Sequence, residues 1–188
     1  MTLVDNGASS YRRFLDGDDT GLGEIIRDYK DGLILYLNGY VKNIHIAEEL
    51  AEDTFFKLCV KRPHFYEKYS FKTWLYTIGK NLAINYLKKA SWTAGLPISE
   101  YEDVLADEES LEKEYIKNEE KIILHRAIGS LKPDYSAVLY LVYFEDMSND
   151  ETAKILKKSK RQIENLLYRA KAALKLKLEK EGFIYEEL

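Results

Sequence analysis

The sequence of 188 residues contains one cysteine, three histidines, three prolines and ten glycines. A lone cysteine, Cys59, cannot form an internal disulfide, which excludes a disulfide-stapled secreted domain and favours a reducing compartment. Three separated histidines (His45, His64 and His125) and one cysteine do not supply the ligand set of a structural zinc site. Few glycines and prolines, with 46% hydrophobic and 32% charged residues, predict a folded and mainly helical chain.

Long apolar runs are also missing from the sequence. No stretch approaches the roughly 20 consecutive apolar residues that a membrane-spanning helix needs. Residues 1–10, MTLVDNGASS, have neither the basic start nor the apolar middle of a signal peptide. We therefore expect a soluble, cytoplasmic protein with no membrane span.

The formal net charge of −4 hides an uneven distribution. Residues 91–118 hold eight acidic and two basic side chains, which gives that segment a net charge of −6. The residues on either side carry 13 basic and 12 acidic groups each. Within them, residues 57–89 and 154–177 are strongly basic, with one acidic residue apiece, Glu67 and Glu164. Each half of the chain therefore holds one basic stretch suited to polyanions.

The acidic segment also contains Gly95 and Pro97 and has no clear helical periodicity. Because its like charges repel one another, we interpret 91–118 as an extended linker. The predicted organisation is two small all-α domains, 1–90 and 119–188, joined by this linker. The alternative is a further solvated helix in a single domain, which could begin near Leu111 and Tyr115.

Both helices expected in the second part of the first domain are amphipathic. In residues 47–58 the apolar positions recur at helical spacing, and four acidic residues lie off that stripe. The buried stripe is Ala47, Leu50, Ala51, Thr54, Phe55 and Leu58. In residues 71–89 the expected core face is Phe71, Trp74, Leu75, Ile78 and Leu82, and the other side carries Thr77, Lys80, Asn81, Asn85 and Lys88.

The second domain ends in the pattern of a helix-turn-helix. Pro133 suits the first turn of a helix, and Ser148 with Glu151 forms a capping box that opens the next one. Ser159 can cap a last helix, 160–180, whose core stripe includes Ile163 and Ala170. Two helices joined by about four residues form a helix-turn-helix. The free face of the second helix is basic, with Lys160, Arg161, Arg169 and Lys171.

Four segments in this order resemble the extracytoplasmic-function (ECF) group of bacterial RNA polymerase sigma factors. They are AEELAEDTFFKL, FKTWLYTIGKNLAINYLKK, LKPDYSAVLYLVYFEDMSNDETAKIL and SKRQIENLLYRAKAAL, with a linker after the second. The resemblance runs from about Tyr11 to Gly182. It implies a factor that binds core RNA polymerase and directs transcription initiation at specific promoters, without catalytic chemistry of its own.

The resemblance implies that the helix around 47–60 docks on the clamp helices of the polymerase β′ subunit, while the second domain meets the β flap. The residues implied in polymerase binding are Glu48, Glu49, Glu52, Asp53 and Phe56. A solvated acidic helix face is the alternative for these carboxylates.

The segment 64–89 resembles the part that opens the −10 promoter element and reads it as a single strand. Single-strand binding combines basic grooves with aromatic platforms, and asparagine offers both a donor and an acceptor to base edges. The implied residues are Phe65, Tyr66, Tyr69, Thr77, Lys80, Asn81, Asn85 and Lys88. The aromatic residues could instead belong to the core, where we expect Phe71, Trp74 and Leu75.

The last helix resembles the one that reads the −35 element in the major groove. The implied residues are Ser159, Lys160, Arg161, Gln162, Glu164, Asn165, Tyr168, Arg169 and Lys171. Its start reads Lys-Arg-Gln where many relatives carry Gly-Thr-Val, so the promoter sequence cannot be predicted. Glu164 could accept from a cytosine amino group or merely repel phosphates, and we favour the cytosine contact.

A metal-dependent enzyme and a stand-alone DNA-binding regulator are the two alternative functions. An enzyme with a di-metal site would need the Glu-x-x-His motif twice, and only the reversed pair His45 and Glu48 is present, so neither a metal nor a cofactor is expected. A stand-alone helix-turn-helix regulator would need a ligand pocket in the first domain rather than an acidic face. Within the family, the linker could lie in a basic channel of the polymerase, and an anti-sigma factor is a common partner.

Overall fold

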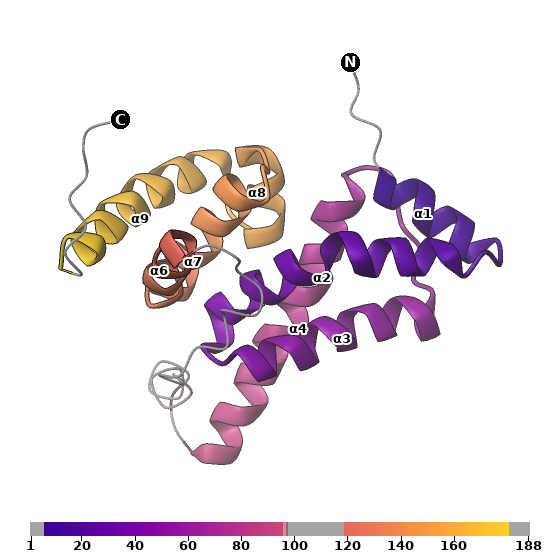
Figure 1. Ribbon diagram of the computed structural model, residues 1–188, viewed down its shortest axis with the longest axis horizontal. Helices are drawn as coiled ribbons and strands as arrows, with labels where there is room; N and C mark the ends of the chain where they lie inside the picture. Colours follow the sequence, from indigo (N-terminus) through magenta and orange to yellow (C-terminus); the bar gives the residue numbers. More distant parts are fainter. Residues whose placement is uncertain (1–5, 96, 98–118, 181–188) are drawn as a thin grey trace.

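The computed structural model describes residues 6–95, 97 and 119–180, and every regular element among them is helical (Figure 1). An all-α fold is therefore confirmed for these residues. None of the described helices is long and apolar enough to cross a membrane. In chain order the elements are α1 (Asn6–Leu15), α2 (Thr20–Val41), α3 (Ile44–Lys61), α4 (Phe71–Ala94), α6 (Glu119–Gly129), α7 (Pro133–Leu139), a π-helical turn (Tyr140–Phe144), α8 (Asn149–Leu156) and α9 (Lys160–Lys180).

Helices α1 to α4 form the first bundle, in which α2 packs against α1, α3 and α4. All six residues of the predicted stripe on α3 are buried. Its apolar members belong to the same core cluster as Leu33 and Leu37 of α2, which are also fully buried. Each fully buried leucine or isoleucine of this core contributes about 1.5–3 kcal/mol of hydrophobic stabilisation, and buried aromatic residues such as Tyr36 and Phe71 add to it. The acidic side of α3 is thereby directed to solvent.

Local sequence signals set the ends of α3 and α4. The side chains of Asn43 and Ser70 accept hydrogen bonds from the Ile46 and Thr73 amides and so cap the two helix starts. Gly95, with a φ of +67°, ends α4 in the left-handed conformation that glycine adopts easily. Helix α4 thus runs four residues beyond position 90, into the stretch predicted as linker. The rest of that prediction, residues 98–118, lies outside the described residues.

An aromatic cluster holds the loop between α3 and α4 against the bundle. The ring of Phe65 packs against Phe71 at 5.6 Å and Trp74 at 5.2 Å between centroids. Tyr11 of α1 packs on Phe71 and donates its hydroxyl to the carbonyl of Pro63 at 2.7 Å. Phe71 and Leu75 are fully buried and Trp74 is half-buried against the core, as the sequence predicted.

The second bundle comprises α6 to α9. Pro133 occupies the first turn of α7, but the helix passes into a π-helical turn at Tyr140 instead of continuing through Phe144. The predicted capping box at the start of α8 is complete, with Ser148 and Glu151 exchanging hydrogen bonds between side chain and backbone. Helix α9 follows after Lys157, which adopts a left-handed conformation. Together α8 and α9 form the predicted helix-turn-helix.

The two bundles pack against each other, which the sequence analysis did not anticipate. Helix α2 approaches α7 so closely that a Cβ on Gly39 would lie 2.5 Å from the Ser136 hydroxyl. The Lys72 ammonium lies 2.6 Å from a Glu145 carboxylate oxygen, and it also donates to the Glu145 carbonyl. Figure 1 shows α2 and α4 beside the helices of the second bundle. This contact positions the face of α4 that was expected to bind DNA.

One carboxylate joins the starts of α4 and α8. Glu151 accepts from Ser148 through one oxygen and from the Ser70 and Thr73 hydroxyls through the other. Partial burial raises the pKa of Glu151, but these hydrogen bonds outweigh it and leave that pKa below its ordinary value. Glu151, a member of the capping box of α8, therefore also joins the two bundles.

Candidate nucleic-acid interface

The outer side of α3 combines carboxylates with exposed apolar side chains. Glu49, Glu52 and Asp53 are exposed, and Glu48 is half-buried and lies 3.3 Å from His45. Phe56 is 66% exposed and Val60, one turn further on, is 55% exposed. We call Glu49, Glu52, Asp53, Phe56 and Val60 the α3 face. Val60 is not among the residues predicted for this surface, although its spacing of four residues from Phe56 indicates that the two lie on one side of the helix.

The three aromatic residues of the loop before α4 lie in different environments. Phe65 is part of the core cluster described above. Tyr66 is 73% exposed, and the ring of His64 lies nearly perpendicular to it at 4.3 Å between centroids. Tyr69 is 37% exposed and lies under the Lys154 ammonium of α8, which lowers the Tyr69 pKa by hydrogen bonding. Of the three, Tyr66 offers the ring face that a base could stack on.

A hollow of about 470 Å³ separates this loop from the start of α1. Small, charged and aromatic residues line it together, namely Ala8, Ser9, Arg12, Phe65, Glu67, Tyr69 and Ser70. Arg12 and Glu67 pair across it at 2.9 Å, and both side chains are 62% exposed. An exposed pair of this kind stabilises the fold little and can rearrange for a ligand.

The outward side of α4 carries the predicted polar residues, and the structure divides them into two groups. Asn81, Asn85 and Lys88 are exposed and lie on successive turns; we call these three the α4 stripe. Thr77 and Lys80 are half-buried. The Lys80 ammonium donates to the Ile155 carbonyl of α8 at 2.8 Å, and burial lowers the Lys80 pKa. Contact between Lys80 and DNA would therefore require α8 to move away.

Helix α9 begins with a second reciprocal cap. Ser159 accepts from the Gln162 amide at 3.2 Å, and the Gln162 side-chain oxygen accepts from the Ser159 amide at 2.7 Å. The side-chain oxygen of Gln162 is used in this cap, so its amide NH2 group is the part that could donate to a base edge. The Lys160 ammonium lies 3.0 Å from a carboxylate oxygen of Asp150 on α8. The cap and this ion pair fix the first turn of α9.

The other predicted residues of α9, from Arg161 onward, are exposed to solvent. The buried Ile163 and Ala170 hold the helix on the bundle. Tyr168 is 79% exposed, and Lys171 lies to one side, 5.0 Å above the Tyr143 ring. We call the exposed set the α9 face, which consists of Arg161, Glu164, Asn165, Tyr168 and Arg169.

Within the part of the chain that the structure describes, no three His, Cys, Asp or Glu side chains come close enough to hold a metal ion. The surfaces are instead open, elongated and charged, which suits macromolecules.

Two family models match this chain, one over the first bundle and one over the second. Residues 25–93 match the family model for Sigma-70 region 2, and residues 121–174 match that for Sigma-70, region 4. The chain is 27% identical over 172 residues to the ECF RNA polymerase sigma factor SigW of Bacillus subtilis, covering 86% of this chain and 91% of that protein. It is 28% identical over 158 residues to the RNA polymerase sigma factor YlaC of the same organism, with 84% and 91% covered.

Two solved structures share the fold. The sigma factor RpoE of Bartonella quintana, in complex with the anti-sigma factor NepR, superposes with a TM-score of 0.68 at 19% identity, covering 84% of this chain and 96% of that one. CnrH, in complex with the cytosolic domain of CnrY, gives a TM-score of 0.63 at 18% identity, with 93% and 96% covered. The two family models together span nearly two thirds of the sequence, in the order that the helices follow. The chain therefore belongs to the sigma-70 family of promoter-specificity factors for RNA polymerase, as a member of its ECF group.

Proposed function

We propose that this sigma factor uses its three exposed surfaces separately: the α3 face for core RNA polymerase, the loop and α4 stripe for the −10 strand, and the α9 face for the −35 duplex. One observation supports this division above the others. The two DNA-facing surfaces lie on different bundles and differ in chemistry, since one offers amides and an open tyrosine while the other offers charged side chains on a capped helix.

The α3 face suits a basic protein partner. Its carboxylates would steer the approach of that partner, and the exposed Phe56 and Val60 would supply the desolvated centre of the contact. A nucleic acid would be repelled by the same carboxylates. The predicted residue Glu48 stands at the edge of this face.

The loop and the α4 stripe suit an unpaired strand. A base stacked on an aromatic side chain contributes about 1–3 kcal/mol to binding, and Tyr66 has a ring face open to accept one. The amides of Asn81 and Asn85 can then pair with base edges that only strand separation exposes. Lys88 would lie near the backbone phosphates.

The α9 face suits the major groove. Arg161 can form two hydrogen bonds to a guanine, and each such pair discriminates by about 1–3 kcal/mol. Glu164 can accept from a cytosine amino group. Lys171, set to one side against Tyr143, would contact phosphate and add affinity without sequence preference.

The test is transcription by core RNA polymerase with this factor from a genomic promoter library, followed by variants on the promoters that it selects. Asn81→Ala with Asn85→Ala should reduce open-complex formation and leave core binding unchanged. Glu52→Lys with Asp53→Lys should weaken core binding first. A core-binding defect in the asparagine variants would show that the surfaces are wrongly assigned.

A randomised −35 selection on the same core enzyme tests the α9 face. Arg161→Ala should relax base preference at one or two positions, whereas Lys171→Ala should weaken all sequences equally and reduce the salt slope by about one unit. Lys175→Ala is a matched control, because this exposed lysine of α9 belongs to neither group and pairs only loosely with Glu179 at 3.9 Å. Unchanged preferences in the Arg161 and Glu164 variants together would exclude this helix as the reader.

The family matches do not favour the alternative of a stand-alone DNA-binding regulator. It would bind its promoter duplex without core polymerase and would have no use for the exposed Phe56. Specific binding by the isolated chain, equal in affinity to that of the holoenzyme, would support it. We also propose regulation by an anti-sigma factor, a partner class that the Bartonella quintana relative binds. Such a partner should compete with core polymerase for the chain.

A further inference from the structure

The last two turns of α4 expose a tryptophan to solvent. Trp92 is 87% exposed, more than any other large apolar side chain in the described residues. An indole is normally buried, because its large apolar surface stabilises a core and its N–H needs only one partner. Trp74, the other tryptophan of the chain, follows that rule and packs in the aromatic cluster. The exposure of Trp92 therefore indicates a surface made for a ligand.

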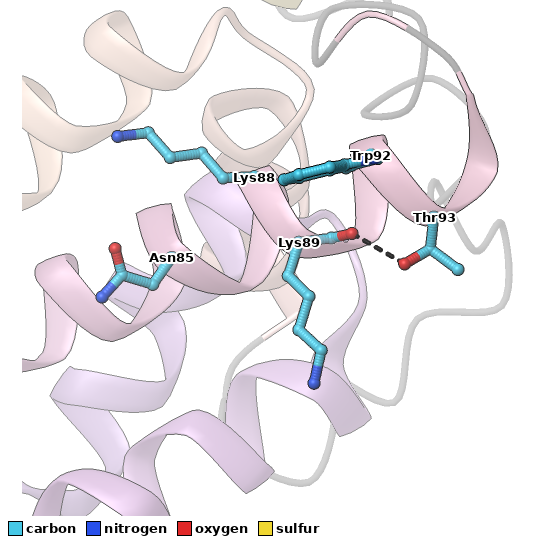
Figure 2. Close-up of a pocket in the computed structure, with 5 residues that line it drawn as sticks. All are labelled: Asn85, Lys88, Lys89, Trp92 and Thr93. Atoms are coloured by element: carbon cyan, nitrogen blue, oxygen red, sulfur yellow. Dashed lines mark hydrogen bonds between the residues drawn. The ribbon is translucent and has the colours of Figure 1, made fainter.

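The immediate surroundings of Trp92 are basic and polar. Asn85, Lys88, Lys89 and Thr93 line a shallow surface hollow with it (Figure 2). The Thr93 hydroxyl donates to the Lys89 carbonyl at 2.9 Å, so it is engaged with the helix itself. Figure 2 shows the Lys88 and Lys89 ammonium groups directed to different sides of α4. A surface that presents an open aromatic ring and two lysines fits a base attached to a phosphate backbone.

The position of Trp92 continues the α4 stripe. Asn81, Asn85, Lys88 and Trp92 follow at intervals of four, three and four residues, so they lie along one side of the helix. With a rise of about 1.5 Å per residue, Trp92 lies roughly 10 Å beyond Asn85 along the axis. That separation is large enough for the strand to place a further base beyond the one at Asn85.

We propose that Trp92, Lys88 and Lys89 form an additional DNA-binding site, in which the indole stacks on a further unpaired base beyond the one at Asn85 and the lysines hold the phosphates beside it. The proposal rests on the proposed function of the α4 stripe and extends it by one site. The ligand is the promoter single strand, and no contact with bases in a duplex is required.

The first experiment uses the fluorescence of the full-length chain. In a Trp74→Phe variant, Trp92 is the only tryptophan, so its emission reports the site directly. Titration with single-stranded oligothymidylate at low salt should quench this emission to saturation and shield it from acrylamide, since stacking brings a base onto the indole. A duplex of the same length should quench much less. Equal quenching by both, or none by either, would overturn the proposal.

The second experiment uses the holoenzyme on promoter DNA that carries a single-stranded −10 region. Trp92→Ala and Trp92→Leu should each lower affinity about 5- to 150-fold, which corresponds to the loss of one base stack. Trp92→Phe should retain most of the affinity because it keeps an aromatic face. Lys89→Ala should reduce the salt slope by about 0.7, the value for one phosphate contact on a single strand. Leu176→Ala is the matched control, because it removes an apolar side chain that is 61% exposed on α9.

Other occupants of the surface give different results. If Trp92→Ala and Trp92→Leu weaken binding to core polymerase and leave DNA affinity intact, the surface is a protein contact and the proposal is wrong. If Trp92→Leu binds DNA as the wild type does, stacking is excluded. Failure of the proposed role of the α4 stripe is distinguishable, because Asn81→Ala with Asn85→Ala would then leave open-complex formation unchanged whatever the Trp92 variants do. Circular dichroism should show an unchanged fold in every variant, since Trp92 contributes little to the core.

Discussion

Lowering the pH from 8 to 5 should destabilise the second bundle through one histidine. His125 of α6 is 7% exposed, and its ring lies 4.5 Å from that of Phe144 and contacts the Tyr140 hydroxyl through Nδ1. Burial lowers the pKa of His125 to about 4, and the nearby Lys121 ammonium adds to the effect. The folded protein therefore keeps this imidazole neutral at a pH where an exposed histidine is charged.

The sign and size of the effect follow from proton linkage. In the unfolded chain His125 binds its proton near pH 6.5, and in the folded chain only near pH 4. Between these values the unfolded state binds more protons, so the free energy of unfolding falls as the pH is lowered through this window. Stabilisation is complete above about pH 7. At pH 5 the loss amounts to about 2 kcal/mol, or roughly 4–8 °C in melting temperature for a chain of this size.

Urea unfolding followed by circular dichroism at pH 8, 7, 6 and 5 measures this loss. His125→Gln is the control, because it removes the titrating group while keeping a polar side chain; it should be less stable at pH 8 but nearly flat between pH 7 and pH 5. His45 and His64 are exposed and stay in both proteins. The reasoning is refuted if the wild type and His125→Gln lose stability in parallel, since the loss would then come from other groups.

Three further predictions concern helix starts and the contact between the bundles. Gly39→Val should lower the free energy of unfolding by about 1–3 kcal/mol because the added side chain forces α2 away from α7. Small-angle scattering should show a larger radius of gyration for this variant. In the control Gly23→Ala, the added Cβ meets open space, and the protein should become slightly more stable. Ser148→Ala should cost about 0.5–2 kcal/mol in urea unfolding because the α8 cap is lost. Lys72→Met should lower the free energy of unfolding by about 1–3 kcal/mol, because the Glu145 carboxylate, 11% exposed, loses its ion-pair partner. The double variant with Glu145→Leu should recover much of that loss.

The sequence was sufficient wherever the determining interaction is local. The stripe on α3 follows from helical spacing alone, and Ser148 and Ser159 signal their helix starts because each bonds to a residue only three positions away. The exposure of the α3 and α9 faces follows from the same periodicity. The roles assigned to these faces stay predictions.

Interactions between distant residues could not be predicted in the same way. Nothing near Gly39 indicates that it faces the hydroxyl of Ser136, because a glycine within a helix is compatible with many surroundings. Lys80 has the composition of an exposed residue, yet it is half-buried because α8, some 75 positions later, offers a carbonyl to it. The exposure of Trp92 could not be predicted either, since an aromatic residue at a helix end is as compatible with packing as with exposure.

The shared carboxylate of Glu151 makes the helix-turn-helix sensitive to events on the other bundle. Separating the bundles would remove two of its donors, Ser70 and Thr73, and leave only the cap at Ser148 to hold it in place. The starts of α4 and α8 should then lose hydrogen-exchange protection together, as one cooperative opening unit rather than two independent ones. A ligand that orders either helix start would stiffen the other through this single side chain.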